Sequence, residues 1–267
     1  MTETTPTIAV FPDPEVLAEA AARRFMATAQ QAMDRYGRFS VALAGGSSPR
    51  GLYRRLAAAP FAEALDWRKV DIFWGDERNV PQDHAASNFR MAAEALLRRV
   101  PLPPQNIHPM TAGGDPRQAA DRYDALLQAY FSRPPGRFDL ILLGMGADGH
   151  TASLFPGSAA VTAAAPKGPT RRVMAQHIDK LNDWRITLTP ETINRAALII
   201  FLVTGADKAA TVKEVLNGPH RPAALPSQLV RPAAGRLIWM LDAAAARELD
   251  PQAHRDVLPG RMDPERK

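Results

Sequence analysis

The chain has 267 residues, 46% of them hydrophobic and 23% charged, which is typical of a globular protein and excludes long disorder. It contains no cysteine, which excludes disulfide bonds, thiolate zinc sites and a cysteine nucleophile. The net charge of +5 is small and the basic residues are dispersed, so charge alone does not indicate a nucleic-acid partner.

We expect a soluble, cytoplasmic protein with no membrane anchor. The start of the chain lacks the basic segment and long apolar core of a signal peptide. The longest strongly apolar run, at about 196–203, is far shorter than the ~20 residues that a membrane helix needs. We expect a single α/β domain over residues 1–250 and a polar tail over 251–267.

Strands and helices are predicted to alternate from the start of the chain. A short apolar run at 8–10 predicts a strand. The sequence Asp13-Pro14-Glu15 is typical of a helix start, with an N-cap aspartate and a proline in the first position. Gly37 predicts the end of that helix, and apolar runs at 39–44 and 70–74 predict two buried strands.

Capping residues predict the next three helices. Ser48 precedes Pro49 and is expected to cap a helix that begins there. Ser87 is expected to cap a helix reaching Arg99, and Asp115 one that reaches about Phe131.

The second half of the chain continues the alternation. Residues 139–143 are the most apolar strand candidate, whereas 185–189 alternate polar and apolar side chains and predict a half-buried, antiparallel strand. The remaining predicted elements are a loop at 161–170, a short helix from Thr189, strands at 198–203 and 237–241, and a helix at 206–217 that Gly218 ends. This order predicts an α/β fold, a doubly wound and mostly parallel sheet with helices on both faces, plus a small appended β subregion.

Four predicted strands end in polar loops that contain glycine. These loops are Gly45–Pro49, Gly75–Arg78, Gly144–His150 and Gly205–Lys208. Ligands of open α/β sheets bind beyond the carboxyl ends of the strands, so we expect the four loops to converge on one site.

The first two loops offer groups that hold an anion. Gly45 and Gly46 allow close approach of the backbone, and Ser47 and Ser48 lead into a helix whose free N–H groups attract negative charge. A plain turn with a serine cap is the alternative, since neither a Rossmann fingerprint nor a P-loop is present. In the second loop Asp76 and Glu77 could hold sugar hydroxyls or orient a base, and Arg78 could grip a phosphate. A solvated loop with a local ion pair is the alternative there.

The third loop holds the strongest candidate for a catalytic base. His150 follows Asp148 at the end of the central strand, and histidine is the most frequent general base at neutral pH. In the fourth loop Lys208 lies in the first turn of a helix, where a nearby anion would favour a cation; a solvated lysine is the alternative. Arg185 is either a second anion contact or a water-facing side chain. The histidines lack the spacing of metal ligands, so no metal is predicted.

Together the loops resemble those of the 6-phosphogluconolactonases over about residues 9–245. The matching stretches are Ala44–Pro49, Gly75–Arg78, Ser87–Arg90, Gly144–Gly157, Arg185–Thr189, Gly205–Ala209 and Leu225–Val230. The segment Asp148–Pro156 is the most specific of them. The resemblance implies hydrolysis of the lactone of 6-phosphogluconate, in the oxidative pentose phosphate pathway, without metal, nucleotide or other cofactor.

The resemblance also implies roles for individual residues. His150 would activate water and return the proton to the ring oxygen, with Asp148 or Asp76 orienting the imidazole. Backbone N–H groups of the 144–149 loop would stabilise the oxyanion. The phosphate would lie on the 45–48 loop, held by Arg78 and Lys208, with Arg185 as a weaker candidate. The partner is a small sugar-phosphate lactone, with no nucleic acid and no membrane, and we expect a monomer or weak homodimer.

Two alternatives remain. The related glucosamine-6-phosphate isomerases/deaminases share the doubly wound fold, but they carry a glutamate five residues after the histidine, where this chain has Phe155. They also have an aromatic residue in place of Arg78. A non-catalytic sugar-phosphate sensor would keep the anion loops, but a DNA-binding module has no room before residue 8 and the basic residues form no stripe.

Overall fold

The computed structural model describes residues 5–110, 112–162 and 171–250. A parallel six-stranded sheet forms its centre, in the order β1-β9-β8-β5-β2-β3. Its strands are β1 (Thr7–Phe11), β2 (Phe39–Leu43), β3 (Val70–Trp74), β5 (Leu140–Leu143), β8 (Leu198–Val203) and β9 (Arg236–Asp242). The mostly parallel α/β sheet predicted from the sequence is confirmed. Among the described residues, none of the helices combines the length and the hydropathy of a membrane span.

The strand order explains where a ligand site can form. From β2 the chain proceeds outward to β3, whereas the later strands β5, β8 and β9 are added on the other side of β2. The direction of winding therefore reverses between β2 and β5. Loops after these two strands leave the sheet in opposite directions and open a crevice between them.

The helices largely begin and end where capping residues predict. Helix α1 (Pro14–Tyr36) begins after Asp13, whose carboxylate accepts hydrogen bonds from the N–H groups of Glu15 and Val16 at 2.8 Å, and ends at Gly37 with a φ of 75°. The other helices are α2 (Ser47–Leu56), α3 (Phe61–Ala64), α4 (Asn88–Ala95), α5 (Pro116–Tyr130), α6 (Ala159–Thr162), α7 (Pro190–Asn194), α8 (Ala209–Asn217) and α9 (Ala243–Ala246).

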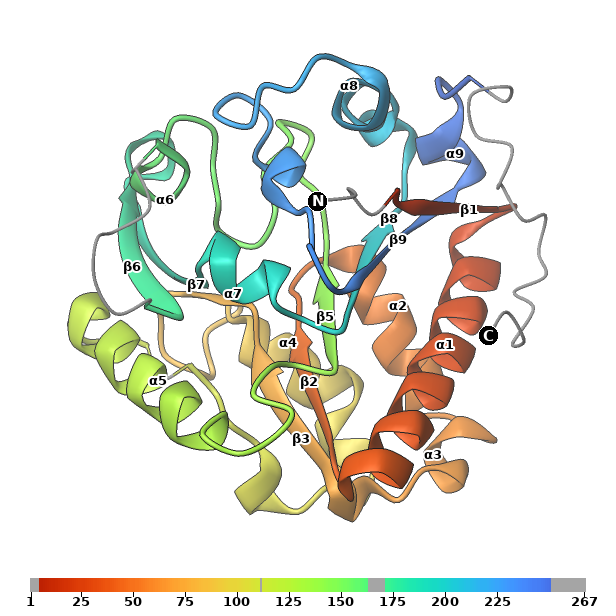
Figure 1. The fold of residues 1–267 in the computed structure, drawn as a ribbon, viewed down its shortest axis with the longest axis vertical. Helices are drawn as coiled ribbons and strands as arrows, with labels where there is room; N and C mark the ends of the chain where they lie inside the picture. The colour runs from red at the N-terminus through yellow and green to blue at the C-terminus, as the bar shows by residue number, and fades with distance from the viewer. Residues whose placement is uncertain (1–4, 111, 163–170, 251–267) are drawn as a thin grey trace.

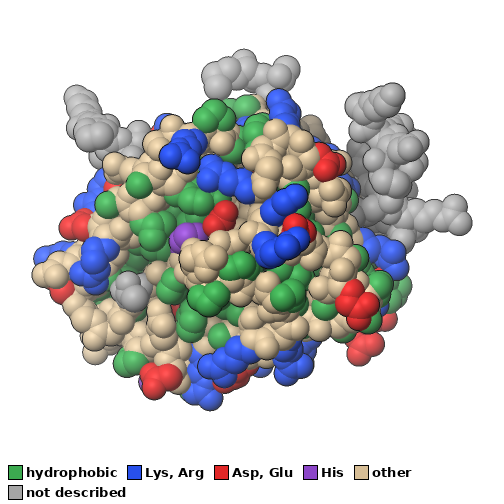
Figure 2. Space-filling model, turned by 90° about the horizontal axis from the view of Figure 1, so that it is seen from below, with side chains coloured by type: hydrophobic (Ala, Val, Ile, Leu, Met, Phe, Trp, Pro, Cys, Tyr) green, Lys and Arg blue, Asp and Glu red, His purple; other side chains and the backbone are tan. Residues whose placement is uncertain are grey.

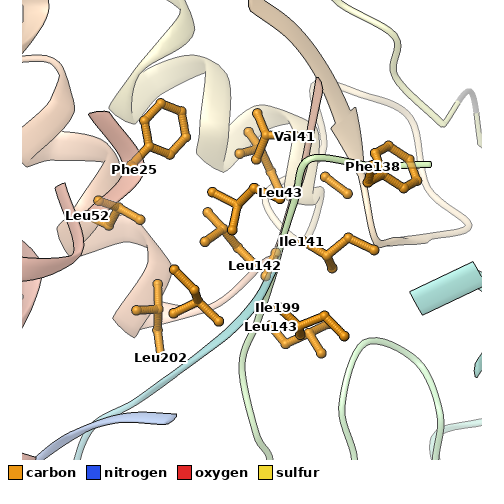
Figure 3. Close-up of a cluster of buried hydrophobic side chains, with 14 of the residues drawn as sticks. Phe25, Val41, Leu43, Leu52, Phe138, Ile141, Leu142, Leu143, Ile199 and Leu202 are labelled. Carbon is orange, nitrogen blue, oxygen red and sulfur yellow. The ribbon is translucent and has the colours of Figure 1, made fainter. Parts of the chain in front are cut away.

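Apolar side chains cover both faces of the central sheet. Phe25 of α1 and Leu52 of α2 pack on the face to which Leu142 points, while Ile141 and Phe138 lie on the other side (Figure 3). In strands buried on both faces, consecutive residues are all apolar, as in Leu140–Leu143, which are fully buried. This two-sided core fixes the carboxyl ends of the strands rigidly.

A second, three-stranded sheet is attached to the first. It has the order β4-β7-β6, with β4 (Asp76–Arg78), β7 (Asp183–Leu188) and β6 (Val173–Ile178), and both pairings are antiparallel. In Figure 1 this sheet and α5 lie on the side of the central sheet opposite α1 and α2. The predicted β subregion with an antiparallel strand near residue 185 is confirmed.

Several local predictions were wrong. The segment Gly75–Arg78 is not a free loop, because its last three residues form β4. Ser48 does not cap α2, which begins at Ser47, two residues before the predicted start; the Ser48 hydroxyl instead bonds Thr204. The helix after Ser87 ends at Ala95 and is followed by a 3-10 turn at Leu97–Arg99. Residues 163–170 and the tail from 251 lie outside the described residues.

Candidate active site

A cavity of about 220 Å³ lies at the carboxyl ends of β2, β5 and β8. All the residues predicted for the site line it except Asp148 and Arg185, namely Gly45, Gly46, Ser47, Ser48, Asp76, Arg78, His150 and Lys208. The convergence of the four glycine-containing loops, expected from the sequence, is therefore observed.

The loop before α2 forms one wall of the cavity. Gly46 has a φ of 99°, in the region that favours glycine, and a Cβ at Gly45 would collide with the side chain of Asn88. The Ser48 hydroxyl lies 2.7 Å from that of Thr204, which links this loop to the end of β8. The first residues of α2, whose N–H groups have no preceding helical turn to bond, line the cavity.

His150 and Asp148 form a close pair on the opposite wall. Nδ1 of His150 lies 2.5 Å from Oδ1 of Asp148, and its ring stacks on Phe155 with a centroid separation of 4.2 Å. A Cβ at Gly146 would collide with both side chains, so only glycine fits there. With Nδ1 engaged by the carboxylate, Nε2 is the nitrogen available to a ligand in the cavity.

Lys180 completes this arrangement from the small sheet. Its Nζ lies 3.3 Å from Oδ2 of Asp148, the oxygen that His150 does not use. Burial raises the pKa of Asp148, but the hydrogen bonds and charge of His150, together with the hydrogen bond from Lys180, outweigh it and hold this pKa below its ordinary value. Asp148 is thus ionised at neutral pH and fixes the orientation of the imidazole.

Asp76 lies in the cavity but does not contact His150. Its carboxylate accepts a 2.6 Å hydrogen bond from the hydroxyl of Ser153 and a longer one, 3.4 Å, from the amide of Asn88. Of the two carboxylates that the sequence left open as partners of the imidazole, Asp148 is therefore the one in contact. Asp76 instead joins the loop after His150 to the start of α4.

The neighbouring Glu77 has a structural position. It is 2% exposed and accepts hydrogen bonds from the backbone N–H groups of Arg78, Asn88 and Phe89, each at 2.8 Å, and from the Ser87 hydroxyl at 3.1 Å. Burial raises the pKa of Glu77 even against these N–H groups, which lower it. The expectation that this carboxylate could hold a sugar hydroxyl is not met, because its oxygens are occupied.

Two cations line the cavity. Nη1 of Arg78 donates a 2.6 Å hydrogen bond to the carbonyl of Ala86, which fixes the guanidinium at the rim. Nζ of Lys208 lies 2.8 Å from the exposed carboxylate of Asp207 while the lysine itself is mostly covered. Arg185 does not line the cavity, because its guanidinium bonds the carboxylate of Asp183 and the carbonyl of Trp184.

Three residues of the site were not identified from the sequence. Asn88 was included only in the matching stretch Ser87–Arg90, with no role, and Thr204 and Lys180 were not singled out. Thr204 carries a detectable signal, since it is a polar residue directly after a buried strand. Lys180 has none, because it reaches Asp148 only through the pairing of β6 with β7. Within the described residues no three histidine, aspartate or glutamate side chains are grouped as metal ligands.

Comparison with known proteins identifies relatives of the whole chain. Residues 12–239 match the family described as glucosamine-6-phosphate isomerases/6-phosphogluconolactonase. A 6-phosphogluconolactonase of Nostoc sp. is 40% identical over 247 residues, which cover 91% of this chain and 98% of the relative. One of Mycobacterium tuberculosis is 39% identical over 254 residues, with 91% and 98% covered.

Solved structures agree with these sequence relatives. A 6-phosphogluconolactonase from Trypanosoma brucei is similar with a TM-score of 0.78 at 30% identity, covering 92% of this chain and all of that one, 100%. A monomeric glucosamine-6-phosphate deaminase is similar in fold, with a TM-score of 0.74 at 21% identity, over 91% of this chain and 99% of the other.

Proposed function

This chain belongs to the glucosamine-6-phosphate isomerase/6-phosphogluconolactonase family. We propose that it hydrolyses 6-phosphogluconolactone with His150 as the general base. The reaction converts 6-phospho-D-glucono-1,5-lactone into 6-phospho-D-gluconate in the oxidative pentose phosphate pathway. The observation that supports the catalytic assignment is the His150–Asp148 pair, 2.5 Å apart, facing a cavity that also holds Arg78 and Lys208.

The chemistry follows from the nature of a lactone, which is a cyclic ester. Water attacks the carbonyl carbon while Nε2 of His150 takes one of its protons, and a tetrahedral intermediate with a negatively charged oxygen forms. The bond from the carbonyl carbon to the ring oxygen then breaks, and the imidazolium returns the proton to that oxygen. The products are one carboxylate and one hydroxyl, and the ionised carboxylate requires the release of one proton to solvent.

Asp148 acts as the positioning residue of this base. Its Oδ1 accepts from Nδ1 of His150, which selects the tautomer with a free Nε2, and its negative charge stabilises the imidazolium. Phe155 stacks on the ring and limits its rotation. The negative oxygen of the intermediate requires donors, and the N–H groups of Gly146 and Gly149 are already bonded to carbonyls of the same loop. We therefore place this role on the cavity-lining loop residues Gly144 and Met145.

The substrate phosphate is placed at the start of α2. Free N–H groups and the positive end of the helix attract it there, and Arg78 and Lys208 supply charge. Lys208→Ala is expected to raise KM about tenfold or more with little change in kcat, the loss of one charge-assisted hydrogen bond of ~1.5–3 kcal/mol. Lys213→Ala, at an exposed position of α8, is the control; an unchanged KM in Lys208→Ala contradicts the phosphate placement.

A coupled assay tests the reaction and the base together. The lactone is generated in place by glucose-6-phosphate dehydrogenase, and 6-phosphogluconate formation is followed above the spontaneous rate for the native chain and for His150→Ala. Acceleration by the native chain alone supports the proposal, and equal acceleration by both removes His150 from the role of base. Glucosamine 6-phosphate is the second substrate, and its turnover would favour the isomerase. Phe155 argues against that alternative because it cannot carry a proton.

We further propose that the enzyme is a single domain over residues 1–250, acting in the cytoplasm as a monomer or weak homodimer without a nucleic-acid partner. Figure 2 supports the last point, because basic and acidic side chains are interspersed on the face that it shows. Sedimentation equilibrium tests the oligomeric state, and a stable higher oligomer would contradict it. Binding of sugar phosphate without turnover would favour a sensor.

A further inference from the structure

A second hollow lies between α2 and α4, outside the catalytic cavity. Its volume is about 270 Å³, close to the 220 Å³ of the catalytic cavity, so a molecule of similar size fits it. Arg50 and Arg54 line it from one face of α2, and Arg90 and Glu94 line it from α4. Arg99, from the 3-10 turn after α4, closes the group of four arginines.

This hollow has a large excess of positive charge. Glu94 is the one acidic residue among its lining, and it is bonded by Nε of Arg90 at 2.8 Å. Nε of Arg99 donates to the Glu94 backbone carbonyl at 3.0 Å, which leaves its charge uncompensated. In the described part of the chain the side chains of Arg50 and Arg54 make no hydrogen bond or close ion pair, although Glu94 interacts electrostatically with Arg50. The four guanidinium groups share this single carboxylate of the lining, and a bound anion would relieve their mutual repulsion.

The residues around the hollow are held in place by the fold. Arg50 and Arg54 are one turn apart on α2, which packs against α4. Nη1 of Arg90 donates to the carbonyl of Asp83 at 2.8 Å, which fixes this guanidinium beside the hollow. The two helices also begin at the catalytic cavity, where Ser47 and Asn88 line the wall. The backbone of the two packed helices therefore places all four arginines around one hollow.

We propose that the hollow between α2 and α4 binds a compact anion with at least two acidic groups, either two phosphates or a phosphate and a carboxylate. Arginine forks bind such groups with paired hydrogen bonds. The lining of the hollow carries four arginines and one glutamate, so its net positive charge exceeds the negative charge of a single phosphate group. The lining of the catalytic cavity has a smaller net charge, because it carries Arg78, Lys208 and the carboxylate of Asp76. The volume of about 270 Å³ suits a small metabolite.

Calorimetric titration of the full chain with inorganic pyrophosphate tests this site. The double variant Arg54→Gln with Arg99→Gln removes two of the four guanidiniums at exposed positions and leaves every residue of the catalytic cavity in place. We expect pyrophosphate binding to weaken at least about tenfold, as two charge-assisted hydrogen bonds predict. The matched control is Arg122→Gln with Lys213→Gln, which removes the same charge from exposed positions of α5 and α8 and should leave binding within about twofold.

A third protein separates the hollow from the catalytic cavity. Lys208→Ala weakens anion binding in the catalytic cavity and should retain pyrophosphate binding at the second site. Loss of binding in Lys208→Ala, with retention in the double arginine variant, overturns the proposal. Equal weakening in the double variant and its charge-matched control, or no binding by the native chain, overturns it as well. Thermal melting of each variant verifies that the fold is intact.

Discussion

The carboxylates of Asp148 and Glu77, each within two residues of a residue that lines the catalytic cavity, are held in different ways. Asp148 is bonded by two side chains that bear or can acquire positive charge, His150 and Lys180, and its pKa is lowered. Glu77 is deeply buried, is bonded by N–H and O–H groups with no cation, and its pKa is raised. The contacts of Asp148 suit a carboxylate that stabilises positive charge on the His150 imidazole. The contacts of Glu77 suit a carboxylate that holds the backbone of neighbouring segments in place.

The strongest test of this contrast is the removal of the base. His150→Ala is expected to lower kcat by roughly 100- to 10,000-fold, the usual worth of general acid–base catalysis, with little change in melting temperature. The matched control is His177→Ala, because Nδ1 of His177 lies 2.9 Å from Asp179 in the same i, i+2 arrangement but outside the catalytic cavity. Comparable kcat values in the two variants would contradict the assignment.

Asp148→Asn tests the positioning role. We expect kcat to fall by roughly 10- to 1,000-fold, because the amide cannot stabilise the imidazolium or enforce the tautomer. The pKa of Asp148 is lower in the folded chain than in the unfolded one. Its contribution to stability is therefore present above the ordinary aspartate pKa and lost as pH falls through the folded value.

Urea unfolding of the native chain and of Asp148→Asn across that acidic range measures the contribution. The difference in stability between them should shrink as the pH falls. A constant difference would mean that the carboxylate of Asp148 is not held by its partners in the folded state.

Glu77→Gln is expected to affect stability more than chemistry. One amide oxygen cannot replace a carboxylate that accepts four hydrogen bonds, so the free energy of unfolding should fall by ~1–3 kcal/mol. Because the folded pKa of Glu77 is raised, the native chain loses stability as pH rises through that value, and Glu77→Gln should lack this loss. Urea unfolding with Glu63→Gln, an exposed position, as control checks both effects.

The smallest expected effect is at Lys180. Its side chain is 72% exposed, so Lys180→Ala should change stability by less than about 1 kcal/mol. The pKa of Asp148 should nevertheless rise, because one of the groups that lower it is gone. NMR titration of the Asp148 carboxyl carbon measures this shift directly, and an unchanged pKa would show that His150 alone holds the carboxylate.

The strands of the central sheet could be predicted from the sequence, whereas those of the small sheet largely could not. The strands of the central sheet were predicted almost to the residue, since two-sided burial demands apolar runs such as 198–203. Strand β4 was missed because Asp76-Glu77-Arg78 has no apolar residue, and it pairs with β7 only through tertiary contacts. Strand β6 was also not predicted, although it contains apolar residues, and without its pairing to β7 the contact of Lys180 with Asp148 could not be inferred.

Site residues in loops of the central sheet were likewise easier to predict than those positioned by the small sheet. Gly45 and His150, in the loops after β2 and β5, were found because strand ends converge at one edge, whereas Thr204 was missed although it directly follows β8. Arg185 was placed correctly on its strand, but the sequence left open a contact with an anion or a side chain facing water, and the guanidinium instead bonds Asp183. The alternation of side chains along a strand determines which face of the sheet a residue lies on. Its bonding partner depends on residues that are close in space but not in sequence.

The pairing of β1 with β9 has a consequence for synthesis of the chain. Thr7 lies opposite Ile238, so the first strand to leave the ribosome must wait for the last before it can join the sheet. At ~5–20 residues per second this delay is roughly 12 to 50 seconds, and once β8 has been made, one of its edges also stays unpaired until β9 follows. The nascent chain therefore exposes apolar strand edges late in translation, and slowing elongation should increase its dependence on chaperones.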